Sequence, residues 1–367
     1  MYRAEETFRY EAVENLFPTG EKTAWFDIET TGLSYDVSKV YLIGIAERSS
    51  DGIKLTQLFA DTLDSEVEIL TYFTDYIKNV EKLIHYNGDG FDLPFVRKRC
   101  ARLNIPFDDS HIESIDIYKK MKPYKELFGL PNLRQPTVEA MMSTDRVDET
   151  NGGELIEVYS LYIKYVLSKN DKADDLRRIL LLHNHDDVKG LVKISRILEF
   201  DNEIKNISDF MDSVNAEKKE EGAEFIFELP YIPSAGEIHK DSYSICMENN
   251  GRVIISVPVI NEELKLFYSD YRNYRYLINE DKIIHKSIAQ FMDKSLVRKV
   301  KASECYTGYR SDFIPVPIPI SAHTFVREYK GKEVFLELNE KFTGSQDLMK
   351  RYCGIILKKA LDNHKMM

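Results

Sequence analysis

The feature that most constrains this chain is a pair of acids inside an apolar, β-prone run, TAWFDIET at residues 23–30. Asp27 and Glu29 are two residues apart, and side chains alternate along a strand, so both carboxylates are expected on one face. The other face would then carry Ala24, Phe26 and Ile28. Two carboxylates near a sheet repel each other and lose hydration, and a divalent cation such as Mg²⁺ or Mn²⁺ offsets both costs. The pair therefore predicts a metal site, although an isolated D-x-E at a strand end is more often simply solvated.

Two further acidic segments follow in the sequence. In NGDGFD, at 87–92, Asp92 falls at an expected helix start, where the helix dipole favours a negative charge. In HNHDD, at 183–187, which we expect ahead of a helix, His183 and Asp187 are four residues apart and share a helical face. A histidine near a metal-binding acid suits a general base, because its unperturbed pKa is near 6.5. Either segment alone is also typical of an ordinary turn or helix start.

Taken in order, FDIETTGL, N-x-x-x-FD and a histidine followed by Asp resemble the three motifs of the proofreading, or DEDD, 3′–5′ exonuclease superfamily. Within that superfamily, the chain resembles the YprB-like group of ribonuclease-H-like domains. Two further segments resemble the same group, namely LPNLRQPTVE (130–139) and DRVDETNGGELIEVYSLYIKY (145–165). The resemblance covers about residues 20–200.

The resemblance implies roles for the matching residues. Two Mg²⁺ or Mn²⁺ ions would be held by Asp27, Glu29, Asp92 and Asp187, with one ion activating water and the other stabilising the leaving 3′ oxygen. Contacts to the terminal nucleotide would come from Thr30, Thr31 and Leu33, and Asn87, in the second motif, would shape this substrate-binding pocket. The implied function is a metal-dependent 3′–5′ exonuclease that hydrolyses phosphodiester bonds at 3′ ends of single-stranded DNA or RNA. Two alternatives are a nucleic-acid-binding module with weak or no catalysis and an endonuclease of the same fold.

The third motif departs from the superfamily pattern, in which the base is placed as Tyr-x-x-x-Asp or as His-x-x-x-x-Asp. His183 has the spacing of the first class relative to Asp187 and the residue type of the second. Choosing Asp186 instead would put Leu181 in the position of the base, and leucine cannot accept a proton. We therefore predict that Asp187 is the metal ligand of this motif and that His183 is its general base. His185 is expected to point away from the metal site.

Sequence periodicity predicts two domains. Residues 1–204 read as an α/β ribonuclease-H-like domain, a mixed sheet flanked by helices. Its expected strands are 23–30, 40–48, 53–61, 82–87 and 113–121, and its expected helices are 65–80 with Ser65 as N-cap, 91–103, 155–169 and 186–200. A linker or exposed turn is expected at 215–224. Residues 205–367 read as a β-rich α+β domain, with strands at 252–260, 313–320 and 332–342 and a final helix at 347–363.

Part of this second domain differs in charge from the chain as a whole. The net charge of −11 argues against a protein that coats nucleic acid, yet residues 265–310 hold ten basic and five acidic residues among several tyrosines. Such a segment is typical of a surface that binds single-stranded nucleic acid. A β domain with solvated lysines and a tyrosine-rich core has the same composition and is the more common case. The acid-rich N-terminus is no secretory signal, and no apolar run would span a membrane. Four scattered cysteines favour a cytoplasmic location.

Overall fold

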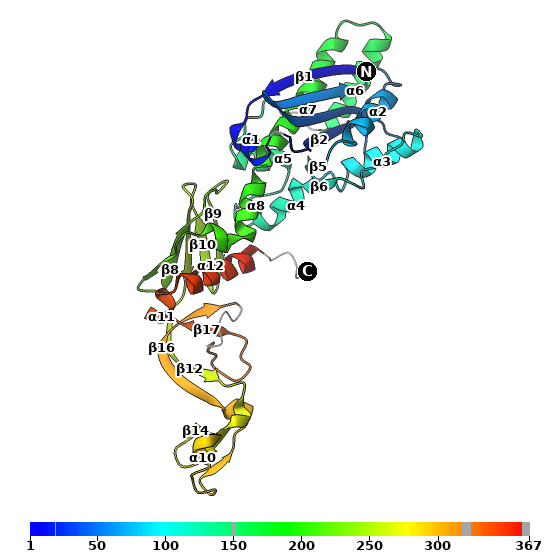
Figure 1. The fold of residues 1–367 in the computed structure, drawn as a ribbon. Helices are drawn as coiled ribbons and strands as arrows, with labels where there is room; N and C mark the ends of the chain where they lie inside the picture. Colours follow the sequence, from blue (N-terminus) through cyan, green and yellow to red (C-terminus); the bar gives the residue numbers. More distant parts are fainter. Residues whose placement is uncertain (19, 149–151, 318–323, 362–367) are drawn as a thin grey trace. The chain divides into compact units, whose positions relative to one another are not determined.

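The computed structural model describes residues 1–18, 20–148, 152–317 and 324–361 (Figure 1). It divides into two compact units, Met1–Asp201 and Asn202–Met367, which we describe separately. Among the described residues, no helix has the length and apolar character needed to cross a bilayer.

The N-terminal unit is built on a six-stranded mixed sheet in the order β1-β4-β3-β2-β5-β6. The strands are β1 (Tyr2–Phe8), β2 (Thr23–Thr30), β3 (Val40–Ser49), β4 (Gly52–Phe59), β5 (Lys82–His85) and β6 (Glu113–Asp116). The pairs from β1 to β2 are antiparallel, whereas β2, β5 and β6 are parallel. The sequence predicted the mixed sheet but missed β1, and the strand expected at 113–121 ends at Asp116, where α4 (Ile117–Met121) begins.

Helices cover both faces of this sheet. Phe26 of β2 stacks on Phe73 of α2 (Glu66–Ile77) with ring centroids 4.7 Å apart. On the opposite face, the indole N–H of Trp25 donates to Ser195 Oγ at 3.1 Å, directly after α7 (Ala173–Ile194). Alternation along β2 therefore directs Ala24, Phe26 and Ile28 into the core and places Asp27 and Glu29 on the other face, as predicted. The helix on that face is α7.

The remaining helices of this unit follow the chain order. They are α1 (Glu11–Leu16), α3 (Asp92–Arg102), η1 (Lys122–Tyr124), α5 (Gln135–Met141), α6 (Gly152–Leu167) and α8 (Ile197–Lys205), which runs across the unit boundary. The prediction that 183–187 precedes a helix was wrong, because α7 begins at Ala173 and carries these residues in its interior. Asp186 and Asp187 resemble helix-start acids in sequence, but other segments of the chain bind both of them.

One prediction about α2 holds for position only, and another was wrong. Ser65 occupies the N-cap position, as predicted, but its hydroxyl donates to Asp61 Oδ1 at 2.8 Å and caps no helix N–H. The helical spacing of apolar residues within 65–80 predicts Val67 on the buried face, but its side chain is 45% exposed, while Glu66 is buried. Glu66 tolerates burial because Arg99 of α3 binds it through two hydrogen bonds, of 2.6 and 2.8 Å.

Gly44 sets how closely α7 approaches the sheet. It lies opposite Asp27 in the β2–β3 register. A Cβ at this position would lie 2.4 Å from Asn184 Oδ1 and 2.5 Å from Val188 Cγ2, both on α7. The absence of a side chain at Gly44 thus lets α7 lie against the part of β2 that carries the acids.

The C-terminal unit is β-rich, as predicted. A five-stranded antiparallel sheet has the order β7-β8-β11-β10-β9, and two three-stranded sheets have the orders β12-β16-β17 and β14-β13-β15. The strands are β7 (Asn215–Lys218), β8 (Ala223–Glu228), β9 (Gly236–Lys240), β10 (Tyr243–Met247), β11 (Arg252–Val257), β12 (Ile260–Phe267), β13 (Tyr274–Leu277), β14 (Lys282–His285), β15 (Val297–Lys299), β16 (Tyr306–Val316) and β17 (Val334–Glu337). The helices are α9 (Ile207–Phe210), α10 (Lys286–Ala289), α11 (Glu340–Thr343) and α12 (Gln346–Leu361), with short turns η2 (Tyr271–Asn273) and η3 (Ala302–Glu304).

The expected linker at 215–224 is instead the β7–β8 hairpin, with Asn215 paired to Ile226. Its charged residues face solvent while Phe225 packs on Tyr352 of α12, with ring centroids 5.0 Å apart. The ends of two predicted elements, 318–320 and 362–363, lie outside the described residues.

Candidate active site

Two acidic motifs meet at the carboxyl ends of the parallel strands. Pairing of β5 with β2 stops at Trp25, so the backbone beyond it, which carries Asp27 and Glu29, has no strand on that side. Asp92, the first residue of α3, is buried there, and its carboxylate accepts a hydrogen bond from the backbone of Ile28. The second motif is thereby tied to the strand residue that lies between the two acids of the first.

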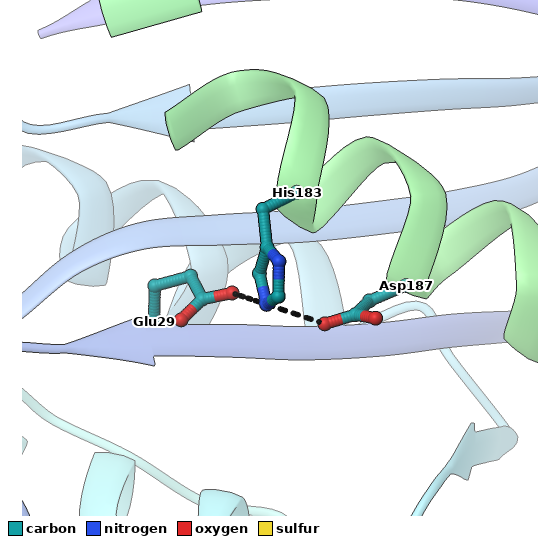
Figure 2. A group of neighbouring side chains, drawn as sticks. All are labelled: Glu29, His183 and Asp187. Atoms are coloured by element: carbon teal, nitrogen blue, oxygen red, sulfur yellow. Dashed lines mark ion pairs between the residues drawn. The ribbon is translucent and has the colours of Figure 1, made fainter. Parts of the chain in front are cut away.

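The third motif arrives on α7 (Figure 2). The His183 side chain extends from α7 to β2, where its Nε2 lies 3.5 Å from Glu29 Oε1 and 3.1 Å from Asp187 Oδ2. One residue further along α7, Asn184 Nδ2 donates to Asp27 Oδ2 at 2.9 Å. Glu29, His183 and Asp187 each offer one possible metal-ligand atom, and these atoms lie within 4.8 Å of one another.

Burial and mutual repulsion raise the pKa values of three of the four acids. Burial and the charges of Asp187, Asp92 and Glu29 hold the pKa of Asp27 well above its usual range, against the hydrogen bond from Asn184. Burial raises the pKa of Glu29 to about 8, with neighbouring acids adding to the shift and His183 opposing it. Burial raises the pKa of Asp92 to about 7, although backbone hydrogen bonds lower it. A divalent cation would relieve this repulsion, since four carboxylates are a suitable oxygen donor set for Mg²⁺ or Mn²⁺.

His183 sits between carboxylates on both sides of its ring. Its Nδ1 lies 2.6 Å from Asp148 Oδ2, while Nε2 faces Asp187 and Glu29. Burial lowers the pKa of His183, but the hydrogen bond and charge of Asp187, helped by Glu29 and Asp148, outweigh burial and raise it to about 9. Asp148 thus orients the ring so that Nε2 is the atom presented to the acid cluster.

Sequence reasoning missed the segment that supports α7. Arg146 Nη1 lies 2.7 Å from Asp187 Oδ1 and 3.2 Å from the buried Glu139 Oε2. Asp186 points away from the acid cluster and accepts the backbone N–H groups of Val147 and Asp148, each at 2.8 Å. Arg146 and Asp148 lie within the stretch 145–165 that the family resemblance covers, but no local pattern in that stretch indicates which residues it meets.

The residues expected at the terminal nucleotide lie in two loops beside the acids. The Thr30 hydroxyl donates to the Gly32 carbonyl at 2.8 Å, and Thr31 Oγ1 accepts the Lys39 N–H at 2.9 Å. Leu33 is 84% exposed. Asn87 is exposed at φ 60°. The two threonine hydroxyls therefore shape the loop after β2, and Leu33 and Asn87 leave their side chains open to solvent.

Interactions with the core anchor the loop after β2. Glu66 Oε1 accepts the Val40 N–H at 2.9 Å, and Arg99 Nη1 donates to the Tyr35 carbonyl at 3.1 Å.

His185, expected to point elsewhere, contacts Glu6 and Asp186 at 3.1 and 3.0 Å.

A second group of possible metal ligands comprises His85, Asp89 and Asp116. Its side chains already have partners within the protein: Lys119 Nζ lies 2.5 Å from Asp89, and the Gly88 N–H donates to His85 Nδ1 at 3.0 Å. Asp116 Oδ1 accepts the Asn87 N–H at 2.9 Å, whereas its Oδ2 is buried without a hydrogen-bond partner among the described residues. We therefore assign this group to holding the 86–89 turn.

Comparison with known proteins places the N-terminal unit in a family. Residues 24–199 match a family model described as the RNase_H superfamily. These residues form a domain of the RNase H superfamily. Its mixed sheet with helices on both faces confirms the predicted ribonuclease-H-like fold class.

Curated relatives match shorter stretches. DNA polymerase 1 of Sulfurisphaera ohwakuensis is 29% identical over 122 residues, which is 30% of this chain and 14% of that protein. A DNA polymerase of Thermococcus sp. (strain 9oN-7) is 32% identical over 91 residues, 22% of this chain and 12% of that protein. The matches thus span only a small part of these relatives.

Solved structures give low overall similarity. The family B DNA polymerase of Pyrobaculum calidifontis has a TM-score of 0.42 at 16% identity, covering 70% of this chain and 35% of the polymerase. Product-bound exonuclease I has a TM-score of 0.32 at 11% identity, covering 79% of this chain and 65% of the exonuclease. At TM-scores of this size, the family assignment rests on the match over residues 24–199.

Proposed function

We propose that the RNase H superfamily domain is a divalent-metal-dependent 3′–5′ exonuclease acting on single-stranded DNA or RNA. One observation carries the proposal: four carboxylates from β2, α3 and α7 converge although burial and repulsion penalise the charges of three of them. Strongly perturbed acids in one place are typical of functional sites. The fold alone does not establish an activity, so the proposal rests on these side chains.

The proposed ligands of two Mg²⁺ or Mn²⁺ ions are Asp27, Glu29, Asp92 and Asp187. When bound, such ions would supply a more acidic water and stabilise negative charge on both the attacking and leaving oxygens of a phosphodiester.

The protein's own residues orient this ligand set. Asn184 holds one oxygen of Asp27, the Ile28 backbone holds Asp92, and Arg146 holds one oxygen of Asp187. His183 presents Nε2 to the cluster, where the charges of Asp187 and Glu29 favour its protonated form. Cations bound by these carboxylates would offset those charges and lower the pKa of the ring, and we propose that the neutral nitrogen then accepts the proton of the attacking water while Asp148 stabilises the charged ring. Leu33 and Asn87 are the proposed contacts for the terminal nucleotide, on loops that Thr30 and Thr31 help to shape.

The test uses the full chain and a single-stranded DNA of about 20 nucleotides labelled at its 5′ end, with an RNA of the same sequence in parallel. The proposal expects a ladder of shortened products with Mg²⁺ or Mn²⁺, none in EDTA and none with Asp27→Asn. Asp175→Asn is the control, because Asp175 is an exposed acid on α7, the helix that carries Asp187, and it is paired with Arg178. Circular single-stranded DNA should resist an exonuclease.

Two outcomes would contradict the proposal. Cleavage of the circular strand would indicate an endonuclease. Binding without turnover, at equal stability of the parent protein and Asp27→Asn, would indicate a binding module on a nuclease fold.

A further inference from the structure

A small sheet in the C-terminal unit carries an aromatic and basic face that the proposed nuclease chemistry does not use. The sheet has β13 at its centre, paired with β14 and β15. Tyr274 and Tyr276 are two residues apart on β13 and therefore project from the same face. The register places His285 opposite Tyr274, and Arg298 opposite Tyr276, so these side chains share that face.

Ring contacts agree with this arrangement. Tyr274 meets His285 edge to face at 5.6 Å and stacks on Tyr268 at 4.9 Å. The Arg298 guanidinium lies over the Tyr276 ring, 4.0 Å from its centroid. The aromatic face, as we call Tyr274, Tyr276, His285 and Arg298, therefore consists of two pairs of planar groups on neighbouring positions of one sheet face.

The opposite face of this sheet carries both packed and charged side chains. Leu277 alternates with Tyr276 and is only 4% exposed, whereas Lys282 and Lys299 share its face and are exposed. On the aromatic face, by contrast, both tyrosines are half-buried, and His285 and Arg298 are exposed.

Charge around the aromatic face is opposite in sign to that of the whole chain. Residues 272–304 contain eight basic and four acidic residues, whereas the chain carries a net charge of −11. Lys286, at the start of α10, directly follows His285 and is exposed. Lys294 is also exposed. Cations next to planar rings are what single-stranded nucleic acid needs, because its phosphates bind lysine and arginine while its bases stack on aromatic rings and guanidinium planes.

Arg298 is paired with Glu304 through both terminal nitrogens, at 2.8 and 3.1 Å, so it offers its guanidinium plane more readily than its charge. We infer that the aromatic face of the β13–β14–β15 sheet binds single-stranded nucleic acid, with Tyr274, Tyr276 and the plane of Arg298 stacking on bases and Lys286 contacting phosphates. A lipid surface or an acidic protein would use the same cations but not the rings. This inference rests on the proposed function in one respect only, namely that the chain acts on nucleic acid.

Binding is measured by fluorescence anisotropy of a labelled oligothymidylate of about 20 nucleotides with the full chain carrying Asp27→Asn, so that the probe stays intact. Replacing both rings (Tyr274→Ala with Tyr276→Ala) should weaken binding about tenfold or more. Lys286→Gln should lower the slope of log affinity against log salt by about 0.7. Tyr309→Ala and Tyr329→Ala are matched controls, because these tyrosines are 39% and 41% exposed in the same unit but lie outside this sheet.

A second measurement needs no substitution on the aromatic face. Photo-crosslinking of the same protein to a 5-iodouracil oligonucleotide, mapped by mass spectrometry, should label Tyr274 or Tyr276. Crosslinks confined to the N-terminal unit, unchanged affinity of the folded double variant, or binding to anionic vesicles in place of the oligonucleotide would each overturn the inference. Asp27 is replaced in every protein of this test, so the test measures binding alone. Its outcome therefore does not depend on whether the parent protein is a nuclease.

Discussion

Asn184 of α7 donates a 2.9 Å hydrogen bond to Asp27 of β2, and its own side-chain oxygen accepts one of 3.0 Å from Gln57 of β4. One fully buried amide therefore connects the helix of the third motif to the carboxylate of the first. Hydrogen bonds of this kind orient metal ligands, and their loss typically costs about 10- to 100-fold in metal affinity or activity.

We expect Asn184→Ala to lower metal-dependent hydrolysis by about 10- to 100-fold. The fall should be accompanied by a higher Mn²⁺ requirement, because Asp27 would lose both its orientation and a hydrogen bond that lowers its pKa. Initial rates at a series of Mn²⁺ concentrations test this. Asn206→Ala, an exposed asparagine, serves as the control. Unchanged rates and metal requirement in Asn184→Ala would show that α7 does not set the position of Asp27.

The acid cluster also predicts how stability depends on pH without metal. With pKa values raised to about 8 and about 7, Glu29 and Asp92 keep protons in the folded state that the unfolded state has already lost. His183, raised to about 9, likewise holds its proton longer in the folded state. Because the folded state binds more protons, the free energy of unfolding should fall as pH rises from about 6 to about 9.

Trp25, the only tryptophan in the sequence, is buried in β2, so its fluorescence reports unfolding of the N-terminal unit. In EDTA the melting temperature should fall from pH 6 to pH 9, and Mn²⁺ should raise it most at high pH, where protons compete least for the carboxylates. A melting temperature in EDTA that is flat or rises over this range would contradict the raised pKa values.

His183 can be separated from its neighbours on the same helix. If Nε2 accepts the proton of the attacking water, His183→Ala should lower kcat by about 100- to 10,000-fold with little change in KM. His185→Ala is the matched control, because His185 lies two residues away and contacts Glu6 and Asp186 instead. A loss of kcat no larger than that of His185→Ala would assign His183 a structural role only.

The buried Arg99–Glu66 pair holds the loop that carries Leu33. Arg99→Met would leave the Glu66 carboxylate buried without its partner and should cost about 3–5 kcal/mol of the free energy of unfolding. Combining it with Glu66→Gln should recover part of the loss. Trp25 fluorescence melting tests both variants, and Arg178→Ala, which breaks an exposed ion pair with Asp175, should leave the melting temperature unchanged. Equal melting temperatures for Arg99→Met and Arg178→Ala would contradict this account.

The parts of the site that follow local rules were accessible from the sequence. Alternation within eight residues places Asp27 and Glu29 on one face of β2, and a four-residue spacing places His183 and Asp187 on one face of α7. The start of α7 was misplaced because two adjacent acids resemble a helix start when their partners are unknown.

The supporting residues depend on contacts between segments distant in the chain. Arg146 meets Asp187 across about forty residues, and Asp148 meets His183 across 35. Nothing within the stretch around Arg146 specifies these partners, because they are determined by how α7 packs on the sheet. The same holds for Glu66, whose burial depends on an arginine from another helix.

Strand β1 bears on how the molecule behaves at high concentration. It pairs with β4 along its whole length, from Tyr2 opposite Phe59 to Phe8 opposite Ile53. Strand β4 is buried at seven of its eight positions, whereas β1 exposes charged residues such as Arg3 and Glu5 at the outer border of the sheet. An uncovered apolar strand invites pairing with another molecule, and a charged one discourages it. The first strand therefore protects the domain against edge-to-edge aggregation.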